Sequence, residues 1–165
     1  MEDLEKQEKP AITLVRATLA DKEAYIDLEK KFDGLKTYSN MTDPKEVEEE
    51  LKKCVVYFIK TGDKVIGSVS YEKKDDDHFY IDGLVIDPEF QGQGFARRAM
   101  EKILQEIGGV KTIDLVTHPE NERAIKLYES LGFTIIKKIE NYFGDGEPRV
   151  LMVRAETKTS QPKDF

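Results

Sequence analysis

Two glycines, Gly92 and Gly94, stand between a predicted strand and a predicted helix. Residues 79–86 are apolar and β-branched, and Asp87-Pro88 ends that run. After the glycines, apolar residues recur every three or four positions, as one face of a helix requires: Ala96, Ala99, Met100, Ile103, Leu104 and Ile107. A helix start offers unpaired N–H groups at the positive end of the dipole, and glycine lets a ligand approach this backbone closely. The stretch predicts an anion site, most often for phosphate. A tight turn without a ligand is the alternative.

A second block lies downstream, with the pattern N-x-x-A-x-x-L-Y-x-x-L-G-F at residues 121–133. Together with QGQGFA at residues 91–96, it resembles the GNAT acetyltransferase superfamily. The first block matches that family's pyrophosphate-binding pattern, and the second matches its usual final helix. The resemblance extends over residues 12–154. Within the family, the chain is similar to both ribosomal-protein N-terminal acetyltransferases and polyamine acetyltransferases.

The resemblance implies acetyl-CoA as co-substrate and no metal. Backbone N–H groups of residues 92–97 would hold the pyrophosphate, and residues 84–86 would pair with the pantetheine arm as an added strand. An N–H near Ile86 would face the thioester oxygen. Ordinary core packing is the alternative role for residues 84–86. The expected cofactor-binding residues are Leu84, Val85, Ile86, Gln91, Gly92, Gln93, Gly94, Phe95, Ala96, Arg97, Asn121 and Tyr128.

Acetyl transfer from a thioester to an amine needs an acid for the departing thiolate and a base for the amine. Tyr128 is the candidate acid, because a phenol with a pKa of about 10 can protonate a thiolate whose thiol has a pKa of about 8.5. The resemblance matches it to a common catalytic tyrosine, although a core aromatic would show the same spacing. Asp82 is the candidate base. It lies four residues before Ile86, which predicts the same strand face for both. Asp114 is a rival base, and a structural ion pair is the alternative role for Asp82.

The acceptor is predicted to be either a small cationic amine or a protein N-terminus. Polyamine acetyltransferases carry a carboxylate at the position matching Asp82, which favours the first class. Ribosomal-protein N-terminal acetyltransferases have a glutamate where this chain has Val116, and valine cannot titrate. Residues 141–152 are nevertheless similar to the closing hairpin of N-terminal acetyltransferases, and this similarity assigns acceptor contact to Tyr142. His118 is expected to cap a loop.

The 165 residues carry a formal net charge of −7 with a pI of about 5.0, which argues against nucleic-acid binding. The single cysteine, Cys54, excludes an intrachain disulfide and is expected to be a buried thiol. No apolar run approaches the length of a membrane span, and the charged residues 1–10 are unlike a signal peptide. We therefore expect a cytoplasmic protein without a membrane partner. The resemblance allows a homodimer.

The pattern of elements predicts a single α+β domain with a mixed, mostly antiparallel sheet of about seven strands flanked by about four helices. Residues 1–11 are expected to be a flexible lead, 12–154 the N-acetyltransferase domain and 155–165 a mobile tail. Residues 72–78 are expected to form a charged loop. Strands are predicted at residues 12–17, 55–60, 65–71, 79–86, 111–117, 133–139 and 149–153. Helices are predicted to begin after Asp21, Asp43 and Gly94, and a short helix is predicted over residues 121–131.

The resulting hypothesis is an N-acetyltransferase that moves acetyl from acetyl-CoA to a primary amine by direct attack. A non-catalytic acyl-CoA sensor on the same fold would keep the glycine loop without needing Tyr128. A nucleotide-binding module would use the glycine loop alone.

Overall fold

A computed structural model describes residues 10–109 and 111–155. The lead and tail expected at residues 1–11 and 155–165 lie almost entirely outside the described residues. Within the described part, no helix combines the length and the apolar character needed to cross a membrane.

Seven strands form one sheet in the order β1-β2-β3-β4-β5-β7-β6. All neighbouring pairs are antiparallel except β4 and β5, which confirms the predicted mixed sheet. The strands are β1 (Thr13–Arg16), β2 (Val55–Thr61), β3 (Lys64–Asp75), β4 (His78–Ile86), β5 (Thr112–Thr117), β6 (Thr134–Ile139) and β7 (Arg149–Arg154).

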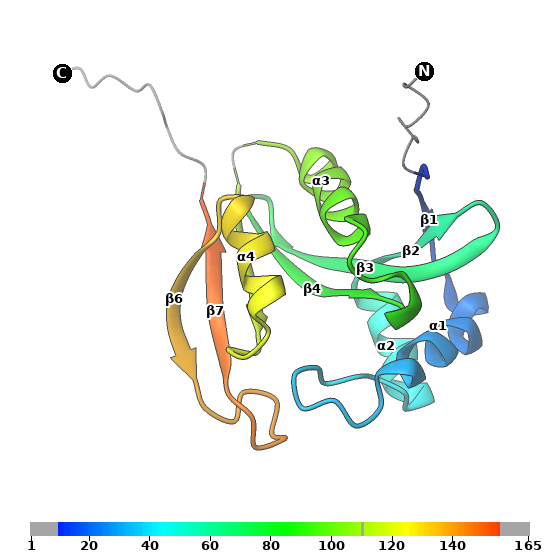
Figure 1. Cartoon of the computed structure of the whole chain (residues 1–165), viewed down its shortest axis with the longest axis horizontal. Helices are drawn as coiled ribbons and strands as arrows, with labels where there is room; N and C mark the ends of the chain where they lie inside the picture. The colour runs from blue at the N-terminus through cyan, green and yellow to red at the C-terminus, as the bar shows by residue number, and fades with distance from the viewer. Residues whose placement is uncertain (1–9, 110, 156–165) are drawn as a thin grey trace, which may run out of the picture.

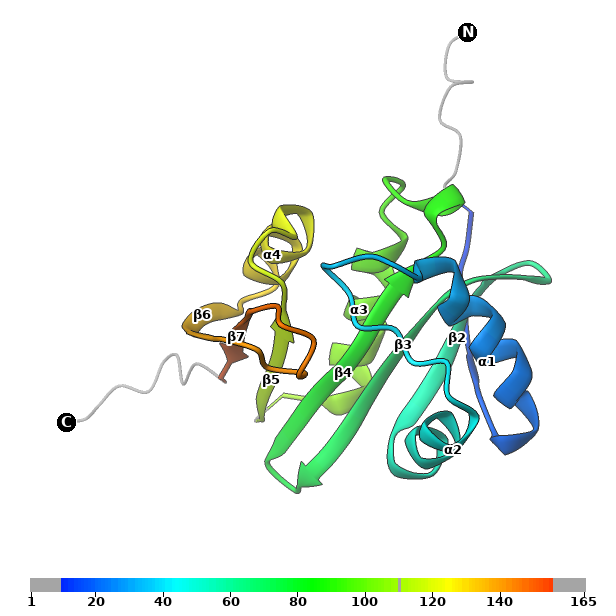
Figure 2. The same cartoon turned by 90° about the horizontal axis from the view of Figure 1, so that it is seen from below.

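Helices cover both faces of this sheet, with α1 and α2 on one face and α3 and α4 on the other (Figures 1 and 2). The four are α1 (Lys22–Glu29), α2 (Pro44–Lys53), α3 (Phe95–Ile107) and α4 (Glu122–Ser130). Of the 3-10 helices in the described residues, η2 (Leu19–Asp21) precedes α1, η3 (Lys30–Phe32) follows it, and η4 (Pro88–Phe90) lies between β4 and the glycine loop. The predicted cap at Asp43 is present, since its carboxylate accepts from two N–H groups of α2. The predicted cap at Asp21 is wrong: its carboxylate accepts instead from the N–H of Thr18, the residue that caps η2. The Asn121 side chain caps α4 by accepting from the N–H of Ala124.

Each face of the sheet has its own apolar core. Ala99, Met100 and Ile103 of α3 are fully enclosed in the larger cluster. Val47 of α2 is fully enclosed in the smaller cluster, which also contains Cys54 as a buried thiol. The glycine loop lies at the edge of the larger core, so burial of the α3 face fixes the loop against β4.

The expected charged loop at residues 72–78 is wrong. β3 and β4 stay paired as far as Asp75 and His78, and only Asp76 and Asp77 turn between them. A strand paired through its backbone can extend past the core, because the ladder does not require apolar side chains where both faces meet solvent.

The parallel strands β4 and β5 pair over only three residues, from His78 opposite Thr112 to Tyr80 opposite Asp114. Beyond that point the strands diverge, while β5 stays paired with β7 through Thr117. The gap is visible between β4 and β5 in Figure 2. The later half of β4 therefore keeps one free backbone edge, and the sheet is not continuous between its two faces at this point.

A β-bulge interrupts β4 at Asp82. Ile81 lies opposite Tyr71 and Gly83 lies opposite Ser70, so Asp82 has no partner on β3. The extra residue reverses the alternation: Ile81 and Ile86 both belong to the α3 core, whereas Asp82 lies beside α2. The expectation that Asp82 and Ile86 share a strand face is therefore wrong, because simple alternation assumes an uninterrupted ladder.

Candidate active site

The glycine loop adopts the backbone conformation that its residues predict. Gly92 and Gly94 have φ angles of 81° and 85°, in the left-handed region that favours glycine, and Gly94 precedes the first turn of α3. The side chain of Gln91 donates to the carbonyl of Ile86 at 2.8 Å and ties the loop to the end of β4. The free N–H groups of the α3 start are thus held beside the free edge of β4.

A cavity of about 270 Å³, here called the glycine-loop cavity, opens between this loop and α4. Of the twelve residues expected to bind the cofactor, Val85 and Gln93 are absent from its lining, and the Val85 side chain belongs to the α1–α2 core. The cavity is lined by Leu84, Ile86, Phe90, Gln91, Gly92, Gly94, Phe95, Ala96, Arg97, Asn121, Arg123, Ala124, Leu127 and Tyr128.

Two guanidinium groups give this cavity a positive lining. Arg97 comes from the first turn of α3 and is held by Glu101 at 3.2 Å. Arg123, from the first turn of α4, was missed by the sequence reasoning; its Nη1 atom lies 3.9 Å from where a β-carbon on Gly92 would stand. Its position two residues after Asn121, at a second helix start, was the available signal.

A second cavity of about 150 Å³, here called the Asp82 cavity, lies where β4 and β5 diverge. The α1–α2 loop and the β6–β7 hairpin contribute to its wall. Leu84, Asn121, Ala124 and Tyr128 line both cavities, so the two meet. The other lining residues are Tyr25, Glu29, Thr37, Tyr38, Ser39, Met41, Ile81, Asp82, Gly83, Leu115, Val116, Thr117, Phe143 and Arg149.

Tyr128 stands at the junction of the two cavities. Its side chain is 7% exposed, and its ring packs edge-on against Phe133 with 5.8 Å between centroids. Burial raises the pKa of the Tyr128 phenol well above its ordinary value. The phenol is therefore protonated at neutral pH, as a proton donor must be.

Asp82 forms a cluster with two buried residues, Glu50 of α2 and Cys54 directly after that helix. The ligand atoms of Asp82, Glu50 and Cys54 lie within 4.8 Å of one another. Burial, reinforced by the Asp82 carboxylate, raises the pKa of Glu50, and burial also raises the pKa of the Cys54 thiol. Glu50 and Cys54 therefore both hold protons at neutral pH, and a metal ion would have to displace these protons.

Asp114, the rival base, lies away from both cavities. Its carboxylate is 2.9 Å from His78 Nε2, near the turn between β3 and β4. It lines a shallow acidic hollow with residues 75–78 and Thr112. Only Asp82 of the two aspartates faces the gap between β4 and β5.

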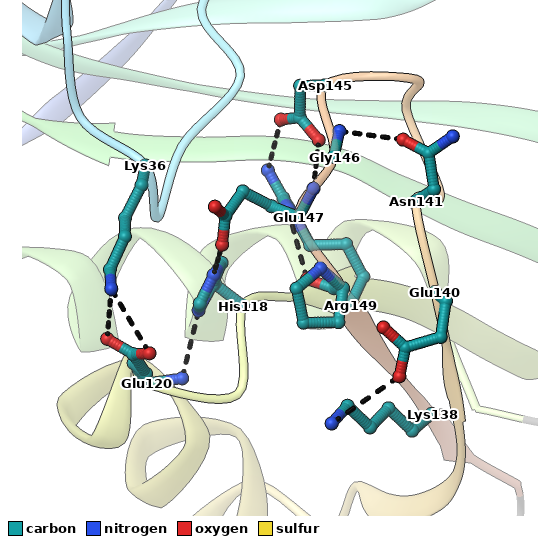
Figure 3. A network of polar contacts seen from close by, with 11 residues as sticks. Lys36, His118, Glu120, Lys138, Glu140, Asn141, Asp145, Gly146, Glu147 and Arg149 are labelled. Carbon is teal, nitrogen blue, oxygen red and sulfur yellow. Dashed lines mark hydrogen bonds and ion pairs between the residues drawn. The ribbon is translucent and has the colours of Figure 1, made fainter.

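A polar network beside the Asp82 cavity joins three loops (Figure 3). His118, which is 1% exposed, accepts from the N–H of Glu120 through Nδ1 and contacts Glu147 through Nε2 at 2.7 Å, so it secures a loop as expected. Lys36 of the α1–α2 loop pairs with Glu120 at 3.0 Å. Tyr142 packs edge-on against Phe143, and the cavity lining includes Phe143 but not Tyr142.

The model of the acetyltransferase (GNAT) family matches residues 22–133, more than half of the chain. The chain belongs to the GNAT family. The glycine loop and the α4 block that carry the resemblance both fall within the matched residues.

Curated relatives of this GNAT chain include a [ribosomal protein bS18]-alanine N-acetyltransferase from Haemophilus ducreyi. It is 35% identical over 75 residues, which cover 42% of this chain and 52% of the relative. An N-terminal acetyltransferase B complex catalytic subunit NAA20 from Arabidopsis thaliana is 28% identical over 89 residues, or 52% of this chain and 51% of the relative. The chain thus spans about half the length of these relatives.

Solved structures share the GNAT fold at low identity. The ribosomal-protein-S18-alanine N-acetyltransferase from Escherichia coli has a TM-score of 0.75 at 21% identity, covering 94% of this chain and all of that one. A chimeric spermidine N-acetyltransferase from Vibrio cholerae and hSSAT has a TM-score of 0.71 at 21% identity, covering 87% of this chain and 95% of that one. At these identities the likeness establishes the fold alone.

Proposed function

We propose that the chain is an acetyl-CoA-dependent N-acetyltransferase that transfers acetyl directly to a primary amine. One observation carries this proposal: the glycine-loop cavity and the Asp82 cavity meet at Tyr128, in the gap between β4 and β5. Two reactants that enter from the two cavities would have their reacting groups beside a buried phenol. We also propose a cytoplasmic location, because a single buried free thiol fits a reducing compartment.

The glycine-loop cavity fits the pyrophosphate and pantetheine parts of acetyl-CoA. N–H groups of the α3 start would hold the pyrophosphate, with Arg97 and Arg123 supplying charge. The free edge of β4 at residues 84–86 offers N–H and carbonyl groups to the amides of the pantetheine arm. That alignment would bring the thioester to Tyr128.

The proposed reaction requires no covalent intermediate. Asp82 takes a proton from the ammonium form of the acceptor, and the neutral nitrogen then attacks the thioester carbonyl carbon. A carbon–nitrogen bond forms, the carbon–sulfur bond breaks, and Tyr128 gives its proton to the departing thiolate. The proton released by the new amide nitrogen restores Tyr128, and Asp82 returns its proton to solvent. The buried and protonated Cys54 does not act as a nucleophile in this scheme.

Both acceptor classes expected from the sequence remain within the proposal. The Asp82 carboxylate suits the ammonium group of a small cationic amine or of a peptide N-terminus. The names of the relatives include protein N-terminal acetyltransferases, and a structural neighbour is named for spermidine.

A thiol-release assay tests the proposal. It measures the free thiol formed from acetyl-CoA with each of four kinds of amine acceptor: polyamines, amino acids, aminoglycosides and short peptides. We expect turnover on one amine class. Tyr128→Phe should lower kcat by about 100-fold, since a positioned general acid contributes on that order. Its affinity for acetyl-CoA should stay unchanged, because phenylalanine keeps the packing against Phe133. Asp82→Asn should also lower kcat.

Tyr57→Phe is the matched control, because its hydroxyl bonds Glu106 far from both cavities. This control should turn over like wild type. Tight acetyl-CoA binding without acetylation of any amine would instead favour the sensor alternative. Absence of acetyl-CoA binding would contradict the assignment of the glycine-loop cavity.

A further inference from the structure

The Asp82 cavity has a mixed charge, which bears on the acceptor. Glu29 from α1, Asp82 from β4 and Arg149 from β7 are the charged residues among those that line it. Two carboxylates would suit a molecule with two ammonium groups only if both were free to bind it. A guanidinium would suit an anion or a carbonyl oxygen. The hydrogen bonds of each group decide which of these acceptors the cavity fits.

Both carboxylate oxygens of Glu29 already accept a hydrogen bond from within the chain. One carboxylate oxygen accepts from the N–H of Met41 at 2.7 Å, and the other accepts from the Tyr38 hydroxyl at 2.8 Å. The residue is 1% exposed, and the side chain of Asn40 donates to its backbone carbonyl. Glu29 thus fastens the α1–α2 loop beside the cavity. Of the two carboxylates, Asp82 is therefore the better placed to meet an ammonium group of the acceptor.

Arg149 keeps donors available to the cavity. It is 2% exposed; Nη1 donates to the carbonyl of Pro148 at 3.0 Å, and Nη2 donates to the Asp145 carboxylate at 3.3 Å. A guanidinium has five N–H donors, so these two bonds leave others. Among the described residues, the fully enclosed side-chain nitrogens without a partner include one of Arg98 but none of Arg149. Arg149 is also one of the residues that line the cavity.

We infer that the acceptor carries a carbonyl or carboxylate oxygen next to its primary amine, and that Arg149 binds this oxygen while Asp82 faces the amine. A peptide N-terminus and a free α-amino acid share this chemistry. A polyamine does not, because its second ammonium would meet the guanidinium and find no free carboxylate. The inference rests on the proposed function, and within it Arg149 is a specificity-determining residue.

The mouth of the cavity favours the peptide form of this chemistry. Phe143 lines the cavity while 49% exposed, and the neighbouring Tyr142 is 39% exposed. The Arg149 guanidinium carbon lies 5.0 Å from the centre of the Phe143 ring. An exposed aromatic pair at the mouth can contact the chain that follows an N-terminal residue, whereas a free amino acid has nothing to place there.

The test compares kcat/KM for four acceptors at saturating acetyl-CoA: an alanyl peptide amide, free alanine, isopropylamine and spermidine. Isopropylamine retains the branched amine of alanine but lacks the carbonyl. Hydrogen bonds to a charged group contribute enough for a preference of about tenfold or more. Wild type should therefore prefer the peptide, or alanine, over isopropylamine and spermidine by at least about 10-fold. The ratio of kcat/KM for the peptide to kcat/KM for alanine shows whether the acceptor is a peptide N-terminus or a free amino acid.

Arg149→Met should remove this preference by raising KM for the peptide, with little change for isopropylamine. Arg16→Met, an exposed arginine of β1, is the matched control and should keep the preference. Thermal melting and acetyl-CoA binding report whether Arg149→Met is folded. If it is not, the four wild-type acceptors decide the question alone.

Equal use of isopropylamine and the peptide by wild type, or a preference for spermidine, would overturn the inference while the proposed function stands. An Arg149→Met variant that is folded and keeps the preference would overturn it as well. Acetyl-CoA binding without acetylation of any of the amines would instead remove the proposed function, and this inference with it.

Discussion

Burial sets the protonation state of the side chains around the gap between β4 and β5. The phenol of Tyr128 and the thiol of Cys54 both have pKa values raised by burial. Glu50 is 4% exposed, and one of its carboxylate oxygens has no hydrogen-bond partner among the described residues. An unpaired carboxylate at such a site is costly, so the protonated form is favoured there. Asp82 therefore has a neutral, proton-bearing neighbour on α2.

Glu50→Gln tests this protonation through stability. Burial raises the folded-state pKa of Glu50 above 4.5, so the folded chain binds more protons than the unfolded chain. This contribution to stability is complete below about pH 4.5 and declines as pH rises through the folded pKa. Glutamine does not titrate. The melting temperature of Glu50→Gln should therefore fall less between pH 5 and about pH 9 than that of wild type.

Glu49→Gln, an exposed neighbour on α2, is the control and should follow the wild-type pH dependence. If the melting curves of Glu50→Gln and wild type shift in parallel across this range, Glu50 is not protonated in the folded chain.

β4 is the element on which the site depends, because one edge pairs with β3 while the other is free. Gly67 of β3 lies opposite Ile86, and a β-carbon there would meet the Val85 carbonyl oxygen and the Ile86 backbone. These backbone atoms of β4 cannot move away from the added β-carbon without breaking the β3–β4 pairing. The sequence requires glycine at this position for space, since its φ is not in the left-handed region.

Gly67→Ala should therefore destabilise the fold by about 3 kcal/mol or more, as overpacking of an enclosed position does. Urea unfolding gives this free energy. Gly83→Ala is the matched control on β4, since a β-carbon there would lie 3.4 Å from the Ser70 hydroxyl, which is a side-chain atom. Equal losses of stability in the two variants would contradict the close approach of β3 and β4 at Gly67.

Local signals predicted the glycine loop, the Asp43 cap and the approximate ranges of the strands, because Gly92 and Asp43 act on their own neighbours in sequence. The bulge at Asp82 was not predictable from alternation, since the partner strand determines the register. Arg123 and Arg149 were both missed. Arg149 reaches the Asp82 cavity from an element distant in sequence, and only the folded sheet brings the two together, whereas Arg123 had a signal in its place two residues after Asn121.

At the scale of the whole molecule, the sheet separates two layers of helices, and it is interrupted where β4 and β5 diverge. Helices α3 and α4 cover one face, α1 and α2 cover the other, and β4 and β5 diverge between them (Figures 1 and 2). The glycine-loop cavity and the Asp82 cavity meet at this opening, where Tyr128 lies. In the proposed reaction, this arrangement would let two reactants occupy the protein together, and the acetyl group would pass directly between them.

Initial rates over a grid of acetyl-CoA and amine concentrations test this account most directly. Direct transfer within a ternary complex predicts double-reciprocal lines that intersect. It also predicts that Arg123→Met raises KM for acetyl-CoA about tenfold while leaving KM for the amine unchanged, because it weakens only the pyrophosphate contact. Parallel lines would indicate a covalent acetyl-enzyme and would contradict the account.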